Sequence, residues 1–131
     1  MEQNALKYLE NDRFAALAGI KLVRAEPGFA VARMEITENH LNGVNRVQGG
    51  AIFTLADFAF AAASNSGGIV TLGINVNISY FKSPKGKVIT AEAKEISSGR
   101  KICGFNVDIF DEDKVLVARV SALGYKLGSE L

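Results

Sequence analysis

The chain has 131 residues, of which 48% are apolar and 22% are charged, so it is long enough for one globular domain and too apolar to be disordered. Fifteen Lys and Arg residues balance fourteen Asp and Glu residues, which excludes the basic excess of a nucleic-acid-binding protein. A single cysteine, Cys103, and a single histidine, His40, exclude internal disulfides, cysteine-based metal clusters and multi-histidine zinc sites.

The N-terminal segment has apolar residues at helical spacing: Leu6, Leu9, Phe14, Leu17 and Ala18. We expect a helical segment over about residues 3–18 that ends at Gly19. No basic stretch followed by an apolar stretch indicates a secretory signal. The longest nearly apolar run, residues 51–63, is shorter than the roughly 20 residues that cross a bilayer. We therefore expect a cytoplasmic protein without a membrane partner.

Two short strands and a polar loop come next. Residues 20–25 and 29–36 have strand-like patterns and are joined by the turn signal Pro27-Gly28, and residues 40–45 are turn-like. Gln48-Gly49-Gly50 then opens a run of Ala, Phe, Leu and Ile that extends to Ala63. This composition favours a helix that is buried on nearly all sides.

Four strand-like runs fill the rest of the chain, at residues 70–80, 88–96, 102–109 and 115–125. A long apolar helix followed by an antiparallel meander has few packing solutions. We expect one α+β domain over residues 1–131, in which a curved sheet of five to six strands wraps the helix. A chain of about 130 residues leaves part of such a sheet uncovered, so we also expect burial by a second subunit.

Asp57 is the most informative position, because it interrupts the apolar helix where no cap explains it. Burial of an unpaired carboxylate is costly or raises its pKa. Thr54 lies one turn earlier on the same face, so the two side chains can line one cleft. A catalytic role for Asp57 is one interpretation; a solvent-facing residue or a contact between helices at a dimer interface are the others.

The Gln48-Gly49-Gly50 segment is the second candidate. N–H groups at a helix N-terminus attract negative charge, so the Gly50 N–H can hold a carbonyl oxygen as it becomes an oxyanion. The alternative is a tight turn that needs glycine. Asn42 and Gln48 can fix a carbonyl oxygen or the attacking water, although such residues also hold turns.

Other polar positions allow two interpretations as well. Residues 82–87 and 98–101 form turns that collect cations and can neutralise ligand phosphates, although solvated hairpins are also rich in lysine. We expect His40 to serve on the surface or in a structural role. Cys103 alternates with core positions and has no convincing basic partner, so we expect a small core residue rather than a nucleophile.

The segment from Asn42 through Gln48-Gly49-Gly50 to Asp57 resembles the hotdog-fold acyl-CoA thioesterases and is most similar to the phenylacetic-acid-degradation subgroup. Residues 75–81 and Gly99-Arg100 share the resemblance, which covers roughly residues 14–127. It implies hydrolysis of an aryl- or medium-chain acyl-CoA, with coenzyme A as part of the substrate and with no metal or redox cofactor.

The resemblance also implies residue roles. Asp57 corresponds to the catalytic carboxylate, as nucleophile or general base, the Gly50 N–H to the oxyanion donor, and Asn42 to the loop asparagine. Coenzyme A is expected near two turns, formed by Ser83, Pro84, Ser98, Gly99, Arg100 and Lys101. The family typically forms homodimers with sites shared between subunits, which pair into dimers of dimers.

Two departures from the family pattern matter. Many members carry His where this chain has Gln48, which can donate a hydrogen bond but cannot act as acid or base. Some relatives place Ser or Thr at Gly73, for which Thr71 or Thr54 are the available replacements.

Two other functions stay open from the sequence: a hotdog dehydratase acting on β-hydroxyacyl thioesters and a non-catalytic acyl-CoA-binding module.

For the thioesterase, we expect the acyl chain beside the helix near Phe53, Phe58 and Phe60.

Overall fold

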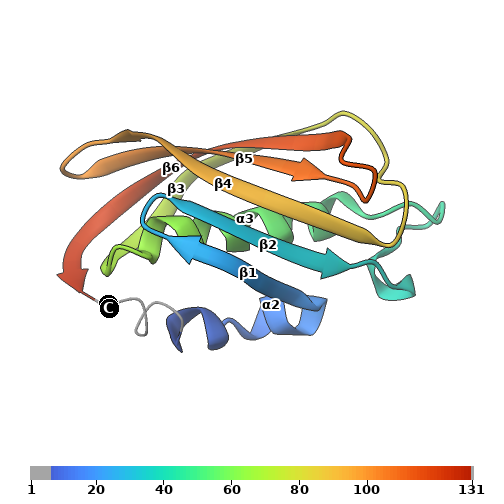
Figure 1. Ribbon diagram of the computed structural model, residues 1–131, viewed down its shortest axis with the longest axis horizontal. Helices are drawn as coiled ribbons and strands as arrows, with labels where there is room; N and C mark the ends of the chain where they lie inside the picture. The colour runs from blue at the N-terminus through green and yellow to red at the C-terminus, as the bar shows by residue number, and fades with distance from the viewer. Residues whose placement is uncertain (1–6, 131) are drawn as a thin grey trace.

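The structure is a computed structural model that describes residues 7–130, and Figure 1 shows one curved sheet lying over a long helix. The six strands are antiparallel and lie in the order β1-β2-β4-β5-β6-β3. The helices are α2 (Arg13–Ala18), the 3-10 helix η1 (Glu38–His40) and α3 (Gly49–Asn65). The strands are β1 (Ile20–Glu26), β2 (Phe29–Glu35), β3 (Ile69–Tyr80), β4 (Val88–Ser98), β5 (Ile102–Phe110) and β6 (Leu116–Glu130). The predicted α+β class and the wrapped helix are confirmed.

The pairing of β3 differs from the predicted meander. β4, β5 and β6 form consecutive hairpins, but β3 pairs with β6 at the edge of the sheet and does not pair with β4. Residues 81–87 therefore cross the end of the sheet. The N–H groups of Phe81 and Lys82 both donate to the Val117 carbonyl, at 2.8 and 3.2 Å, and fix this crossing. Alternation of apolar residues identifies strands, but it does not determine which strands are neighbours.

The N-terminal segment is broken where one helix was expected. Residues 7–10 are helical, the chain turns, and α2 begins after Asp12, whose Oδ1 accepts a hydrogen bond from the Ala15 N–H at 3.0 Å. Residues 3–6 of the expected helix lie outside the described residues. Because a capping aspartate starts a new helix, the apolar periodicity does not continue across it. Phe14 and Leu17 are consequently 66% and 84% exposed.

Small side chains let α3 lie close to the sheet. Its core-facing residues pack against four fully buried alanines on the inner face: Ala30, Ala32, Ala91 and Ala93. Towards the C-terminal end of α3 the Phe60 ring meets Phe105 edge to face, with centroids 5.3 Å apart. Cys103 lies in the core as predicted, and burial raises the pKa of its thiol.

One stripe of α3 stays uncovered by its own chain. Gly50 and Asp57 are exposed, and Phe53, Thr54 and Ala61 on that side are half-buried. The prediction of a helix buried on nearly all sides is wrong for a single chain. Among the helices within residues 7–130, none combines the length and the hydropathy that spanning a bilayer requires.

Asn65 joins the end of α3 to β3. Its side chain is fully buried: Nδ2 donates to the Ala61 carbonyl at 2.8 Å, and Oδ1 accepts from the Thr71 N–H at 2.9 Å. The amide therefore satisfies the buried backbone of Thr71 and, on its other side, the part-buried Ala61 carbonyl.

We expect Asn65→Ala to lower the free energy of unfolding by about 1–3 kcal/mol, because it leaves buried backbone groups unsatisfied. Urea denaturation measures the change. Asn106→Ala, at a half-buried position in β5, is the control and should stay within about 0.5 kcal/mol of wild type. Equal losses in both variants would show that the junction does not depend on the Asn65 amide.

Candidate active site

The site begins at the N-terminus of α3. Gln48 precedes the helix in an extended conformation, and its N–H donates to the His40 carbonyl at 2.8 Å. Gly49 and Gly50 form the first turn, where no carbonyl lies one turn back to accept their N–H groups. Gly50 is exposed, so its N–H stands at the positive end of the helix dipole and within reach of a ligand.

Close contacts with neighbouring side chains explain why positions 49 and 50 are glycines. A Cβ on Gly49 would lie 3.0 Å from the Tyr80 Oη, and this hydroxyl donates to the Gly49 carbonyl at 2.8 Å. A Cβ on Gly50 would lie 2.5 Å from the Gln48 Oε1, so the Gln48 side chain folds over Gly50. The structure thus brings Gln48 and Gly50 together, as their proposed cooperation on one carbonyl oxygen requires.

Thr54 lies one turn into α3, and its hydroxyl donates to the Gly50 carbonyl at 2.7 Å. Thr54 is therefore beside the candidate oxyanion donor. The other threonine offered as a replacement at the Gly73 position, Thr71, is buried at the far end of α3 and is bound to Asn65. Of the two, only Thr54 lies on the uncovered stripe.

Asn42 organises its own loop. Its Oδ1 accepts hydrogen bonds from the N–H groups of Val44 at 3.0 Å and Arg46 at 3.1 Å. This is the turn-holding interpretation that the sequence left open. Asn42 does not line the cavity that reaches Gly50, and its catalytic role stays a prediction.

His40 has a structural role. Its ring is buried, Nδ1 accepts from the Thr37 N–H at 2.9 Å, and Nε2 donates to the Ala18 carbonyl at 2.7 Å. The ring therefore ties η1 to the last residue of α2. Because both ring nitrogens are engaged in backbone hydrogen bonds, His40 does not supply the free imidazole that a hotdog dehydratase pairs with its carboxylate.

Asp57 lies on the same stripe as Gly50, two turns further along α3. It is exposed in the single chain, as in the solvent-facing alternative that the sequence left open, and its catalytic role stays a prediction. The neighbouring Ala56 and Phe58 turn towards the interior, and Asp57 turns outward. The surrounding protein removes part of the water from the carboxylate, and this desolvation, with a smaller contribution from the negative charge of Asp12, raises the pKa of Asp57 above its usual value of 3.8.

Helix geometry separates the two candidate groups. Seven residues at 1.5 Å of rise place Asp57 about 10 Å from Gly50 along the axis. A single thioester carbonyl cannot touch both groups of one chain. If they act on the same substrate, the carboxylate must come from a second copy.

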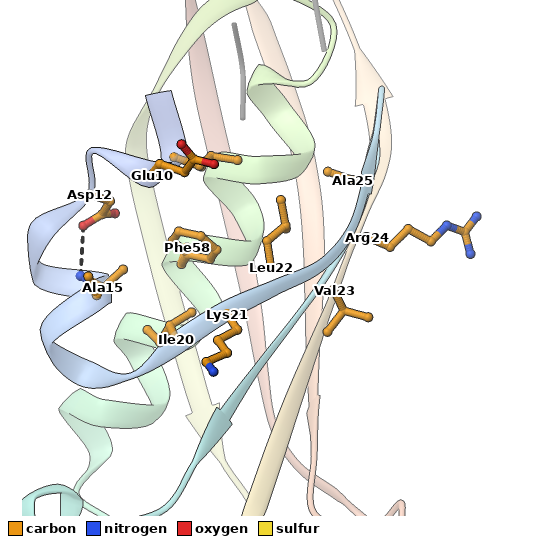
Figure 2. A pocket seen from close by; sticks show the side chains of 12 residues that line it. Glu10, Asp12, Ala15, Ile20, Lys21, Leu22, Val23, Arg24, Ala25 and Phe58 are labelled. Carbon is orange, nitrogen blue, oxygen red and sulfur yellow. Dashed lines mark hydrogen bonds between the residues drawn. The ribbon is translucent and has the colours of Figure 1, made fainter. Parts of the chain in front are cut away.

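Three cavities are lined by residues of α2. One of them, of about 610 Å³, lies along residues of β1 and β2, and the other two concern the expected acyl site. The cavity in Figure 2, of about 630 Å³, lies between β1 and the N-terminal helices, with Phe58 and Leu22 on its inner side. The second, of about 660 Å³, is lined by Phe14, Leu17, Ala18, Asn39, His40, Gln48, Gly50, Ala51, Phe53 and Thr54. Of these two cavities, the second reaches the start of α3. Of the three phenylalanines expected beside the acyl chain, Phe53 lines it, Phe58 lines the other cavity, and Phe60 is in the core.

The turns expected to bind coenzyme A lie far apart. Ser83 and Pro84 line a cavity of about 410 Å³ with Arg46, Gly49 and Tyr80, close to the start of α3. Residues 98–101 lie at the opposite end of β4 (Figure 1), about 30 Å away at the usual rise of a strand. There, Lys126 Nζ donates to the Ser98 Oγ at 3.1 Å and to the Gly99 carbonyl at 2.8 Å. One chain therefore does not bring these turns together.

No group of three His, Cys, Asp or Glu side chains within residues 7–130 is placed to hold a metal ion. The roles of Ser83, Pro84, Ser98, Gly99, Arg100 and Lys101 stay predictions.

Known proteins share this architecture. Residues 45–118 match the family model of the thioesterase superfamily. The acyl-coenzyme A thioesterase PaaI of Escherichia coli K12 is 32% identical over 130 residues, which cover 98% of this chain and 93% of that protein. The structure of the E. coli PaaI protein from the phenylacetic acid degradation operon has a TM-score of 0.93 at 31% identity, and the alignment covers 98% of this chain and 94% of that one.

A third similarity comes from Thermus thermophilus. The structure of a variant of its phenylacetic acid degradation protein PaaI has a TM-score of 0.84 at 30% identity, covering 88% of this chain and 100% of that one. The comparisons confirm the hotdog fold and the PaaI-type resemblance predicted from the sequence. The matched segment includes Gly50, Thr54 and Asp57, and the chain belongs to the thioesterase superfamily.

Proposed function

We propose that this protein is an acyl-CoA thioesterase that hydrolyses an aryl- or medium-chain acyl-CoA to the free acid and coenzyme A. One observation carries the proposal: Gly50, in the first turn of α3, lines a largely apolar cavity, and a carboxylate, Asp57, follows on the same uncovered stripe. Membership of the thioesterase superfamily and the similarity to an acyl-coenzyme A thioesterase support this reaction class.

The chemistry follows from these groups. The thioester carbonyl oxygen accepts from the Gly50 N–H and from the Gln48 side chain, which stabilise the oxyanion by about 3–4 kcal/mol per donor. In the general-base route, Asp57 takes a proton from water as the oxygen bonds to the carbonyl carbon. The C–S bond then breaks, and the proton passes to the departing thiolate. In the alternative route, the Asp57 carboxylate attacks the carbonyl carbon, the C–S bond breaks, and coenzyme A leaves as the thiolate. Water then hydrolyses the resulting anhydride, which restores the Asp57 carboxylate and releases the acid, and the proton released passes to the thiolate.

The proposal includes a homodimer with shared active sites. The separation of about 10 Å between Gly50 and Asp57 along one helix supports this arrangement, because the carboxylate then comes from the facing subunit. The distance between the turns at Ser83 and Ser98 supports contributions to coenzyme A binding from more than one subunit. A dimer of dimers in the cytoplasm completes the proposal.

We expect Asp57→Asn to lower kcat by about 10²–10⁴ while binding of coenzyme A and the melting temperature stay close to wild type, because general-base assistance is lost. Thiol release from a panel of acyl-CoA esters measures the rate. Asp113→Asn, in an exposed turn, is the matched control. Wild-type rates in Asp57→Asn on every ester would refute the role of Asp57, and tight binding without thiol release by wild type would indicate a binding module.

Subunit mixing tests the shared site. Gln48→Ala and Asp57→Ala subunits, each nearly inactive alone, should recover activity when refolded together, because one site of each mixed dimer then holds both native side chains. Statistical mixing should yield about a quarter of the wild-type sites. No recovery beyond the sum of the separate variants, with mixed dimers shown by mass spectrometry, would refute the shared site.

The pH profile should show the raised pKa of Asp57. Activity needs the carboxylate, so kcat/KM rises with pH through this pKa, and the midpoint should lie above the usual value of 3.8. Asp12→Asn removes a like charge but keeps a capping side chain, so the acid limb should move to lower pH. Glu10→Gln, a neighbouring change of the same charge, is the control. Identical acid limbs in wild type and Asp12→Asn would contradict this coupling.

A further inference from the structure

Phe14 and Leu17 form an exposed apolar pair that the packing of the chain does not explain. They lie three residues apart on α2, which places them on one face, and they are 66% and 84% exposed. Elsewhere in this segment Leu9 and Ala15 supply the contacts with the core. The pair therefore adds little to the stability of the single chain.

The same two side chains line the cavity that ends at Gly50. Gln48, Gly50 and Thr54 form its polar end, and Phe14, Leu17 and Phe53 contribute its large apolar side chains. A ligand with its carbonyl at the Gly50 N–H can therefore extend an apolar tail along α2 without leaving this cavity.

α2 is held in place against the start of α3. Asp12 caps its first turn, Gly19 ends it with a left-handed φ of 82°, and the Ala18 carbonyl accepts from the His40 Nε2 at 2.7 Å. The His40 carbonyl in turn accepts from the Gln48 N–H. His40 thus holds in place both α2, on the apolar side of the cavity, and Gln48, on its polar side.

The cavity that reaches Gly50 differs from the cavity in Figure 2 in its charged residues. Its lining residues among the described part of the chain include no Asp, Glu, Lys or Arg. The cavity in Figure 2 contains four such residues: Glu10, Asp12, Lys21 and Arg24. Within this cavity, a carboxylate at the end of an acyl tail would lose water beside Phe14 without gaining an ionic partner, which is unfavourable. Lys21 and Arg33 line a different cavity, which Leu17 also borders.

We propose that α2 is the specificity wall of the enzyme, with Phe14 and Leu17 contacting the distal part of an uncharged, apolar acyl group. The proposal rests on the proposed thioesterase function for the identity of the ligand, an acyl-CoA. It selects aryl and medium-chain acyl groups against short ones and against acyl groups that end in a carboxylate.

Binding of non-hydrolysable S-alkyl-CoA thioethers tests the wall independently of turnover. Titration calorimetry compares S-ethyl-CoA, S-octyl-CoA and an S-(carboxyalkyl)-CoA of the octyl length. Each methylene that leaves water should tighten binding by roughly fourfold. In Phe14→Ala and Leu17→Ala the preference for octyl over ethyl should fall by about tenfold, and S-ethyl-CoA should bind as in wild type. Leu17→Arg should improve binding of the carboxylated thioether over that of S-octyl-CoA.

Val23→Ala is the matched control. Val23 is also apolar and 57% exposed, but it lines the cavity of Figure 2 and does not line the one that reaches Gly50. The inference is overturned if the octyl preference is unchanged in both α2 variants, or if Val23→Ala reduces it equally. It is also overturned if light scattering shows that the α2 variants change the oligomeric mass instead of the preference, since Phe14 and Leu17 would then contact another subunit.

The proposed hydrolase activity and the proposed acyl-binding role of α2 can be refuted separately. In Phe14→Ala and Leu17→Ala, thiol release from acetyl-CoA should fall by less than thiol release from octanoyl-CoA, because the short acyl group does not reach α2. If the wild type releases no thiol from any ester but the thioether pattern holds, the wall stands as a binding site and the hydrolase proposal falls. Equal loss of acetyl-CoA turnover and of S-ethyl-CoA binding in the α2 variants would overturn the wall.

Discussion

The close approach of α3 to the sheet is the constraint on which the rest of the structure depends. Four alanines on two neighbouring strands, Ala30, Ala32, Ala91 and Ala93, remove the side-chain bulk that would hold the helix away. Because the helix is round and the sheet curves only partly around it, one stripe of α3 stays outside. The two groups best suited to act on a ligand, the Gly50 N–H and the Asp57 carboxylate, lie on this stripe. Packing of the core and exposure of the site therefore have the same origin.

The N-terminus of α3 combines several weak local features into one site. The first-turn N–H groups are unpaired in any helix; here they are made accessible by Gly50 and partly covered by the Gln48 side chain. Tyr80 holds the preceding carbonyl from the edge strand β3. Thr54 binds the Gly50 carbonyl from within the helix. The geometry of the oxyanion donor thus depends on contacts from three elements, and substitution at Tyr80 or Thr54 acts on it indirectly.

The spacing of apolar residues predicted the helices and strands well, because it reflects which side of each helix or strand faces the core. It failed where the answer depends on long-range pairing or on a single residue. The position of β3 beside β6 is set by the crossing of residues 81–87, which leaves no periodic signal. The helix breaks at Asp12 because this residue caps the start of α2. The apolar periodicity gives no sign of this break, but an aspartate is a common N-cap residue and could have indicated it. Gly50 and Gln48 were predicted to act together because they are close in sequence, whereas Thr54 was predicted to share a helix face with Asp57, and its hydrogen bond to the Gly50 carbonyl was found only in the structure. The exposure of Phe14 and Leu17, and the outward direction of Asp57, required coordinates.

The hydrogen bonds of His40 have a consequence for how this scaffold can change over evolutionary time. Its ring anchors the end of α2, and its main-chain carbonyl anchors Gln48 before α3. Both ends of the cavity that we propose for the acyl group therefore depend on one residue. The outward surface of α2 takes no part in that anchoring. Residues there can be exchanged to suit another acyl group while His40, and the placement of the reacting atoms with it, stays the same. Substitutions on the outward face of this six-residue helix therefore need not disturb the hydrogen bonds of His40.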